Sequence, residues 1–104
     1  MQLDWNNYYL AAISNDNCVY LTKLPINKLL ATWATRMNIP VYTFYSENAY
    51  RIAKDASNGL PPIFDSAHKY LNNTNILRKG VFFDHWHTDK HLGHCLFGYP
   101  FINI

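Results

Sequence analysis

Short runs of β-branched and aromatic residues, separated by polar segments, predict five strands in this chain. Asn and Asp at positions 14–17 favour a tight turn, so the first two runs should form a β-hairpin. The last two runs are joined by a polar turn at 88–93. The predicted strands are 8–13, 18–21, 40–45, 81–87 and 94–99.

Two segments have apolar residues at helical spacing instead. The first helix is predicted over 25–37, with Pro25 in its first turn and Asn38 closing it. The second helix should be capped by Ser46 and end near Asn58-Gly59. The apolar positions expected to face the core are Ile26, Leu29, Leu30, Trp33, Ala34 and Met37 in the first helix, and Ala49, Ile52, Ala53 and Ala56 in the second.

Residues 60–80 contain Pro61-Pro62 and an Asn-rich stretch, which predicts a long and functional loop that holds His68. Neither repeats nor linkers interrupt the chain, so residues 1–104 should form a single domain. The predicted order is two strands, helix, strand, helix, loop and two strands. The fold class is therefore α+β, with a largely antiparallel sheet, two helices and a C-terminal histidine-rich β-hairpin.

The composition of the chain excludes few classes of function. The net charge of +2 is compatible with a polyanionic partner but far from a basic nucleic-acid arm. Cys18 and Cys95 could form one bridge, but two free thiols are the simpler interpretation in the absence of a CxxC pair. No apolar run approaches the length of a membrane span, and the first residues lack the features of a signal peptide.

The histidines are the main functional signal. Four of the five lie between His85 and His94, and the fifth is His68. Histidine titrates near neutral pH, binds metals and serves as a general acid or base.

Side chains alternate across a strand, so His85 and His87 should share a face. If the turn closes symmetrically, His87 faces His94, His85 faces Leu96 and Phe83 faces Gly98 on the side of the sheet away from the core. The opposite face would then be a core face made of Phe82, Trp86, Cys95 and Phe97. The same register points Asp84 into this core. A buried carboxylate would need an edge position, a partner or a register slip.

This cluster allows three interpretations. In the first, His68, His85, His87 and His94 form a metal-independent acid/base set that cleaves RNA. In the second, His85, His87 and His94 bind Zn²⁺ and leave one position for water. In the third, the histidines are a polar sheet surface and turn with no reactivity. A related alternative is a non-catalytic binding module, in which histidines and tyrosines form the interface with a partner.

The first interpretation needs groups that bind a polyanion and its bases. Lys90, Arg78 or Lys79 could stabilise the phosphate, and Trp86, Tyr70 or Tyr99 could stack on bases. Of these, Lys90, Trp86 and Tyr99 are the predicted substrate-binding residues. No cofactor or metal is then expected.

The second half of the chain resembles a C-terminal domain of bacterial polymorphic toxins. That pattern has an AxxIAK helix, a loop histidine, an HxH with an aromatic middle residue, and HxxxG near the chain end. The matching residues are Ala49 to Lys54, Gly59, Pro62, Ala67-His68, Gly80, His85-Trp86-His87 and His94 to Gly98. The resemblance covers about residues 45–99 and departs at Thr88, where proline is usual, and at the additional His91.

The resemblance implies a toxin and suggests a nuclease. Such domains form the tip of a larger secreted carrier, act in the cytoplasm of a competing cell, and are held inactive by a cognate immunity protein. The partners expected for this chain are therefore an RNA substrate and an immunity protein, with no membrane.

Overall fold

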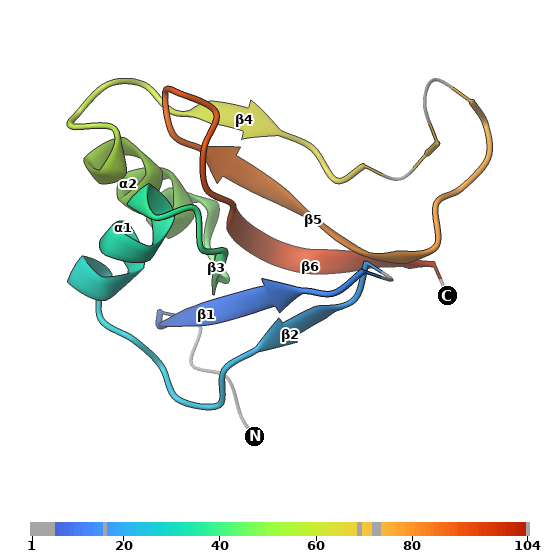
Figure 1. Cartoon of the computed structure of the whole chain (residues 1–104), viewed down its shortest axis with the longest axis horizontal. Coiled ribbons are helices and arrows are strands. Elements are labelled where there is room, and N and C mark those ends of the chain that lie inside the picture. The colour runs from blue at the N-terminus through green and yellow to red at the C-terminus, as the bar shows by residue number, and fades with distance from the viewer. Residues whose placement is uncertain (1–5, 16, 69, 72–73, 104) are drawn as a thin grey trace.

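The computed structural model describes residues 6–15, 17–68, 70–71 and 74–103. In the described part of the chain, two helices pack at one end of a sheet of six strands (Figure 1). This confirms the predicted α+β class. The elements are β1 (Tyr8–Ile13), β2 (Val19–Leu21), α1 (Lys28–Arg36), β3 (Val41–Thr43), α2 (Ser46–Ala56), β4 (Ile63–Asp65), β5 (Gly80–His87) and β6 (Cys95–Asn103). None of the described helices is long and apolar enough to span a membrane.

The sheet has the strand order β2-β1-β3-β6-β5-β4. Only the central pair, β3 and β6, is parallel, and the other pairs are antiparallel. Both predicted hairpins are present: β1 pairs with β2, and β5 pairs with β6. The parallel pair joins the N-terminal and C-terminal parts of the chain in the middle of the sheet.

Strand β4 corrects the prediction of a long loop over residues 60–80. Ile63–Asp65 pairs with β5 and places Asp65 opposite His85. Two prolines precede the strand, and it lies at the sheet edge, where proline and a short strand are tolerated. His68 follows β4 in non-strand structure, as predicted.

The first helix differs from its prediction in both start and orientation. It begins at Lys28, so Pro25 lies before the helix and not in its first turn. Asn27 is the cap, and its side chain accepts a hydrogen bond from the Leu30 N–H. Leu29 is 82% exposed and Trp33 is 51% exposed, although both were expected in the core. Of the predicted core positions, Ala34 is fully buried as expected, and the other buried residues of the helix are small or polar: Ala31, Thr32 and Thr35.

Close approach of α1 to the rest of the fold explains this difference. The Thr35 hydroxyl lies 3.4 Å from the Cys95 sulfur on β6. A Cβ added at Gly93 would lie 2.8 Å from the Thr35 side chain and backbone. At such distances only small side chains fit, so the large apolar residues of α1 point outward.

The second helix follows its prediction more closely. Ala49, Ile52 and Ala53 share a buried face. Asn58 and Gly59 follow the helix with φ of 54° and 88°, the left-handed geometry that ends helices. Its cap is Tyr45, whereas Ser46, the predicted cap, is the first helical residue.

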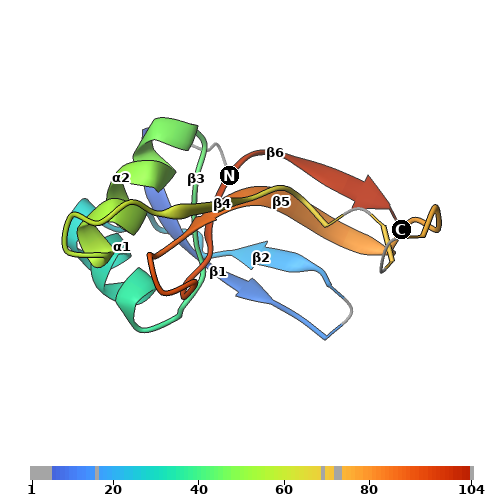
Figure 2. The ribbon, with the colours of Figure 1, turned by 90° about the horizontal axis from the view of Figure 1, so that it is seen from above.

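The sheet has a core on each face. The helices cover the first core, where Ile52 and Cys95 are fully buried. The second core contains Tyr9, Tyr42, Phe83 and Leu96 on the opposite face. Strands β1 and β2 lie opposite β5 and β6 in the view from above, so the sheet curls around this second core (Figure 2).

The curl is closed at one end by the β1–β2 turn. The Val81 N–H at the start of β5 donates to the Asn17 carbonyl, with N and O 2.8 Å apart. Gly80 has a φ of 135°, and a Cβ there would lie 2.5 Å from the Asn17 side chain, so only glycine allows this approach. The contact creates a space between the hairpin and β5 that a flat sheet would not have.

Candidate functional site: a histidine-lined cavity

The concave face of the sheet holds a cavity of about 180 Å³. His68, His85, His87 and His94 line it together with Arg78. The structure thus brings the four predicted catalytic histidines to one place. They come from the segment after β4, from β5 and from the residue before β6.

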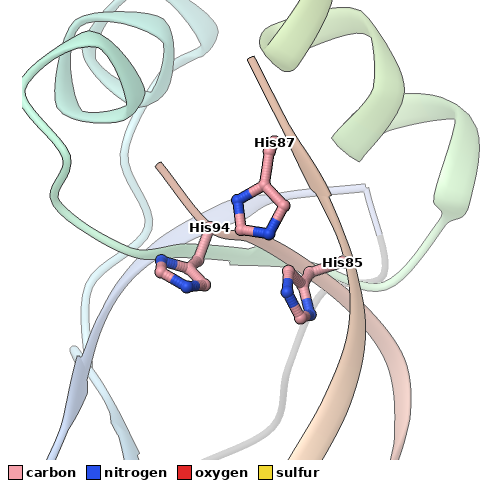
Figure 3. Close-up of side chains that lie close together, drawn as sticks. All are labelled: His85, His87 and His94. Atoms are coloured by element: carbon pink, nitrogen blue, oxygen red, sulfur yellow. The ribbon is translucent and has the colours of Figure 1, made fainter. Parts of the chain in front are cut away.

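The strand geometry explains how three of these rings meet. His85 pairs with Leu96, as predicted, and the ring centroids of His85 and His87 are 4.6 Å apart. The His94 ring lies 5.2 Å from His85 and 4.8 Å from His87. Figure 3 shows the three rings pointing toward one another. They are not on an open face as expected, because the curled sheet leaves His85 and His87 only 5% exposed.

The predicted register fails beyond Asp84. The pairing shifts between Phe82 and Asp84, so the expected pair of Phe83 with Gly98 does not form. This irregularity interrupts the alternation of side chains, and Phe82 and Phe83 both line the cavity. Asp84 is exposed, and its carboxylate accepts a hydrogen bond from the Ala67 N–H at 2.7 Å. The side chain is therefore in solvent and not in the core, which explains why an acidic residue is tolerated there.

The turn between β5 and β6 orients the His87 ring through a hydrogen bond. The Nδ1 of His87 donates to the Gly93 carbonyl. Gly93 has a φ of 69°, and its N–H donates to the Asn38 side chain at 2.8 Å. Since a side chain at Gly93 would collide with α1, this turn requires glycine.

His85 is fixed in one tautomer. Its Nδ1 lies 2.9 Å from the Phe83 carbonyl, which can only accept, so Nδ1 carries the proton and Nε2 carries the lone pair. Burial lowers the pKa of His85 and outweighs the hydrogen bond to the Phe83 carbonyl, which raises it; the nearby His87 acts in the same direction as burial. His85 is therefore a neutral base at neutral pH.

His94 is also neutral. Burial lowers its pKa to about 4, and the neighbouring histidines His85 and His87 act in the same direction. Two neutral imidazoles thus lie beside His87.

Asp65 is the functional residue that sequence reasoning missed. Its Oδ2 lies 2.8 Å from His87 Nε2 and 2.9 Å from His91 Nε2. The hydrogen bond from His91 and the charge of His87 lower the pKa of Asp65 below its usual value, against the effect of burial. The imidazolium form of His87 can donate one N–H to Asp65 and the other to Gly93. In the sequence, the only indication of strand β4 was the apolar pair Ile63-Phe64 before Asp65. Two apolar residues are too few to predict a strand.

His68 lies at the mouth of the cavity. It is exposed, and its ring centroid is 5.8 Å from that of His85. Two contacts hold its segment: Asp84 binds the Ala67 N–H, and an Arg78 N–H donates to the His68 carbonyl at 3.3 Å. The Arg78 guanidinium also lies 4.7 Å from the centre of the Phe82 ring. His68 and Arg78 therefore lie side by side where they line the cavity.

The predicted substrate-binding residues lie elsewhere. Trp86 is on the helix-covered face, where its indole N–H donates to the Ser46 hydroxyl at 3.2 Å. Tyr99 is exposed, with its ring 5.2 Å from that of Phe44. Lys90 lines a separate hollow beside the end of α1. Among the basic candidates, Arg78 is the one that lines the cavity.

The same histidines could bind a metal. One nitrogen from each of His85, His87 and His94 lies within 4.8 Å of the others. His85 and His87 each donate Nδ1–H to a backbone carbonyl, which is how proteins commonly orient metal-binding imidazoles. Asp65 adds a carboxylate beside His87. Cys18 and Cys95 are free thiols, and neither lines the cavity.

No family model matches this chain, and no similar protein was found among the curated proteins or the solved structures. Nothing in these comparisons identifies a polymorphic-toxin domain. The functional argument therefore depends on the geometry of the cavity.

Proposed function

We propose that this domain is a ribonuclease that cleaves phosphodiester bonds by acid/base catalysis and acts as a bacterial toxin. The observation that carries the proposal is the cavity itself, which combines neutral histidines, an exposed histidine and an arginine. A nuclease of this kind needs a base for the 2′-hydroxyl, an acid for the leaving oxygen, and a cation for the phosphate.

His85 is assigned as the general base. It is neutral, and its fixed tautomer leaves Nε2 able to accept a proton. As His85 takes the proton of the 2′-hydroxyl, the 2′-oxygen bonds to phosphorus and the bond from phosphorus to the 5′-oxygen breaks. The products are a 2′,3′-cyclic phosphate and a 5′-hydroxyl.

His68 is assigned as the general acid that protonates the leaving 5′-oxygen. Its exposed position next to His85 suits a group that meets the substrate from the solvent side. Arg78 would pair with the phosphate, because its guanidinium lines the same cavity and carries a permanent charge.

His87 and Asp65 act indirectly. Both ring nitrogens of His87 contact protein acceptors, so neither is free to exchange a proton with a substrate. Its proximity contributes to the lowered pKa of His85 and of His94. His87 is thus a positioning residue, and neutral His94 can donate one N–H to a phosphate oxygen.

The toxin part of the proposal rests on the resemblance of residues 45–99. The residues that carry it include His68, His85, His87 and His94, which meet in the cavity, and Gly80, which allows the cavity to close. We propose accordingly that a larger secreted carrier delivers the domain to the cytoplasm of a target cell. A cognate immunity protein would protect the producer by covering the cavity.

The direct test is cleavage of single-stranded RNA by the purified protein in the presence of a strong chelator. We expect cyclic-phosphate products, and a rate reduced by about 10²–10⁴ in His85→Gln and in His68→Gln. His68 is exposed, so His68→Gln tests the chemistry even if His85→Gln folds poorly. Arg78→Ala should also lower the rate, whereas Lys54→Ala removes an exposed charge outside the cavity and should not.

A test in cells separates the enzyme from a non-catalytic binding module. Controlled expression of the wild-type domain should stop bacterial growth and fragment RNA, and His68→Gln should abolish both effects. Normal growth with intact RNA, at confirmed expression, would refute the toxin proposal and favour a binding module.

A zinc-dependent hydrolase is the second candidate, favoured by the three convergent imidazole nitrogens. Zinc bound by His85, His87 and His94 would supply an activated water. In that case the protein should purify with about one zinc per chain, and chelation should abolish cleavage until zinc is restored. Cleavage that persists after complete chelation would exclude this candidate.

A further inference from the structure

The cavity has an apolar end that the proposed chemistry does not use. On β1, β2 and β5 it is lined by Ile13, Val19, Val81 and Phe83, whereas Leu96 lies opposite His85 at the histidine end. The histidines line the rest of the same cavity. A polar reaction centre that continues into an apolar recess is the usual arrangement of a substrate site.

The size of the recess limits what can enter. The whole cavity is about 180 Å³, well below the roughly 300–1,000 Å³ of sites for drug-sized ligands. An apolar cavity of about 150 Å³ can hold a benzene molecule. The recess is only part of this volume, so it can hold at most one six-membered ring, and the larger double ring of a purine would need the walls to move.

The walls of the recess are fixed. The Phe83 ring packs edge-on against Tyr42 at 5.3 Å, and the Tyr42 hydroxyl donates to the Gly98 carbonyl at 2.8 Å. On the opposite side, the hydrogen bond from Val81 to Asn17 holds the hairpin against β5. Widening the recess would break these contacts.

Asn17 provides a polar group at the apolar end. It lines the cavity, and one N–H of its amide donates to the Lys79 carbonyl at 3.4 Å. A side-chain amide has a second N–H and an oxygen with two lone pairs. These groups can pair with the edge of a base that presents both donors and acceptors, as pyrimidines do.

We propose that this recess binds the pyrimidine base of the nucleotide that carries the attacking 2′-hydroxyl, and so makes the domain a pyrimidine-selective ribonuclease. This inference rests on the proposed function. The base would enter between Val19 and Phe83, with its edge toward Asn17 and its ribose and phosphate toward His85, His68 and Arg78.

The test compares four dinucleotides with the same leaving nucleoside: UpA, CpA, ApA and GpA. We expect UpA and CpA to be cleaved at least about tenfold faster than ApA and GpA. Val19→Phe fills the recess and should slow the cleavage of UpA at least about tenfold. Ala12→Phe adds the same ring on the exposed face of the same hairpin and is the matched control.

A binding measurement makes the inference testable without catalysis. Uridine 3′-phosphate should shift the NMR signals of the histidine rings at lower concentration than adenosine 3′-phosphate, and Val19→Phe should remove this difference. Equal cleavage of the four dinucleotides, or equal binding of the two nucleotides, would refute the pyrimidine pocket while leaving the ribonuclease intact. Absence of both cleavage and binding would refute the two proposals together.

Discussion

Acid should destabilise this protein through the ring of His94. Burial and the nearby histidines lower its pKa from 6.5 to about 4 in the folded state. Because the folded pKa is below the unfolded one, the unfolded chain binds a proton between these values that the native state does not bind. The free energy of unfolding must then decrease as the pH falls through this window.

The size of the effect follows from the two pKa values. Each pH unit across the window removes about 1.4 kcal/mol, so the limit for His94 is about 3 kcal/mol. His94 is only partly buried, and hydration of its charged form reduces the loss to about 2 kcal/mol. The lowered pKa of His85 adds a loss of the same sign. Asp65 does not contribute here, because its lowered pKa gives stability that is lost only below about 3.8.

Urea unfolding at about pH 7.5 and about pH 4.5, in wild type and in His94→Gln, measures this loss. Out of a total stability of about 5–15 kcal/mol, a difference of 2 kcal/mol between the two proteins is readily resolved. Glutamine keeps a polar side chain of similar length but cannot titrate. If His94→Gln loses as much stability on acidification as wild type does, the assigned origin of the acid sensitivity is wrong.

Four further variants test how the fold supports the site. Leu29→Ser should change the unfolding free energy by less than about 0.5 kcal/mol, because Leu29 is exposed, whereas Ile52→Ala in the core should cost about 2–5 kcal/mol in urea unfolding. Gly93→Ala should cost more than about 1 kcal/mol and lower the RNase rate, since the new methyl group meets α1 and displaces the turn behind His87; a stable, fully active variant would contradict this. Asp65→Asn removes the charge beside His87 and should lower the cleavage rate and change its pH profile, and an unaltered pH profile would show that Asp65 has only a structural role.

The local elements were largely predictable from the sequence. The first hairpin, the second helix and the final histidine-rich hairpin follow from turn chemistry and periodicity, which act over a few residues. The shared face of His85 and His87 follows from strand alternation in the same way. These features depend on neighbours in the chain, and the sequence records those neighbours directly.

The failures concern contacts between distant segments. The apolar side of α1 points outward because Thr35 approaches Cys95 too closely for large side chains. The residue pattern of the helix gives no information about its distance from β6. Asp65 is separated from His87 by more than twenty positions and meets it only because β4 pairs with β5.

The sequence by itself therefore indicated the four histidines as candidates for chemistry and the C-terminal hairpin that presents three of them, but not Asp65 or the strand that carries it. Tertiary structure decided that the sheet curls, that Asn17 closes it against β5, and that the histidines line a small cavity instead of an open surface. The physical reason is that curvature and burial arise from packing between segments far apart in the chain. Burial in turn keeps His85 and His94 neutral, so the chemical state of the site is also a product of the fold.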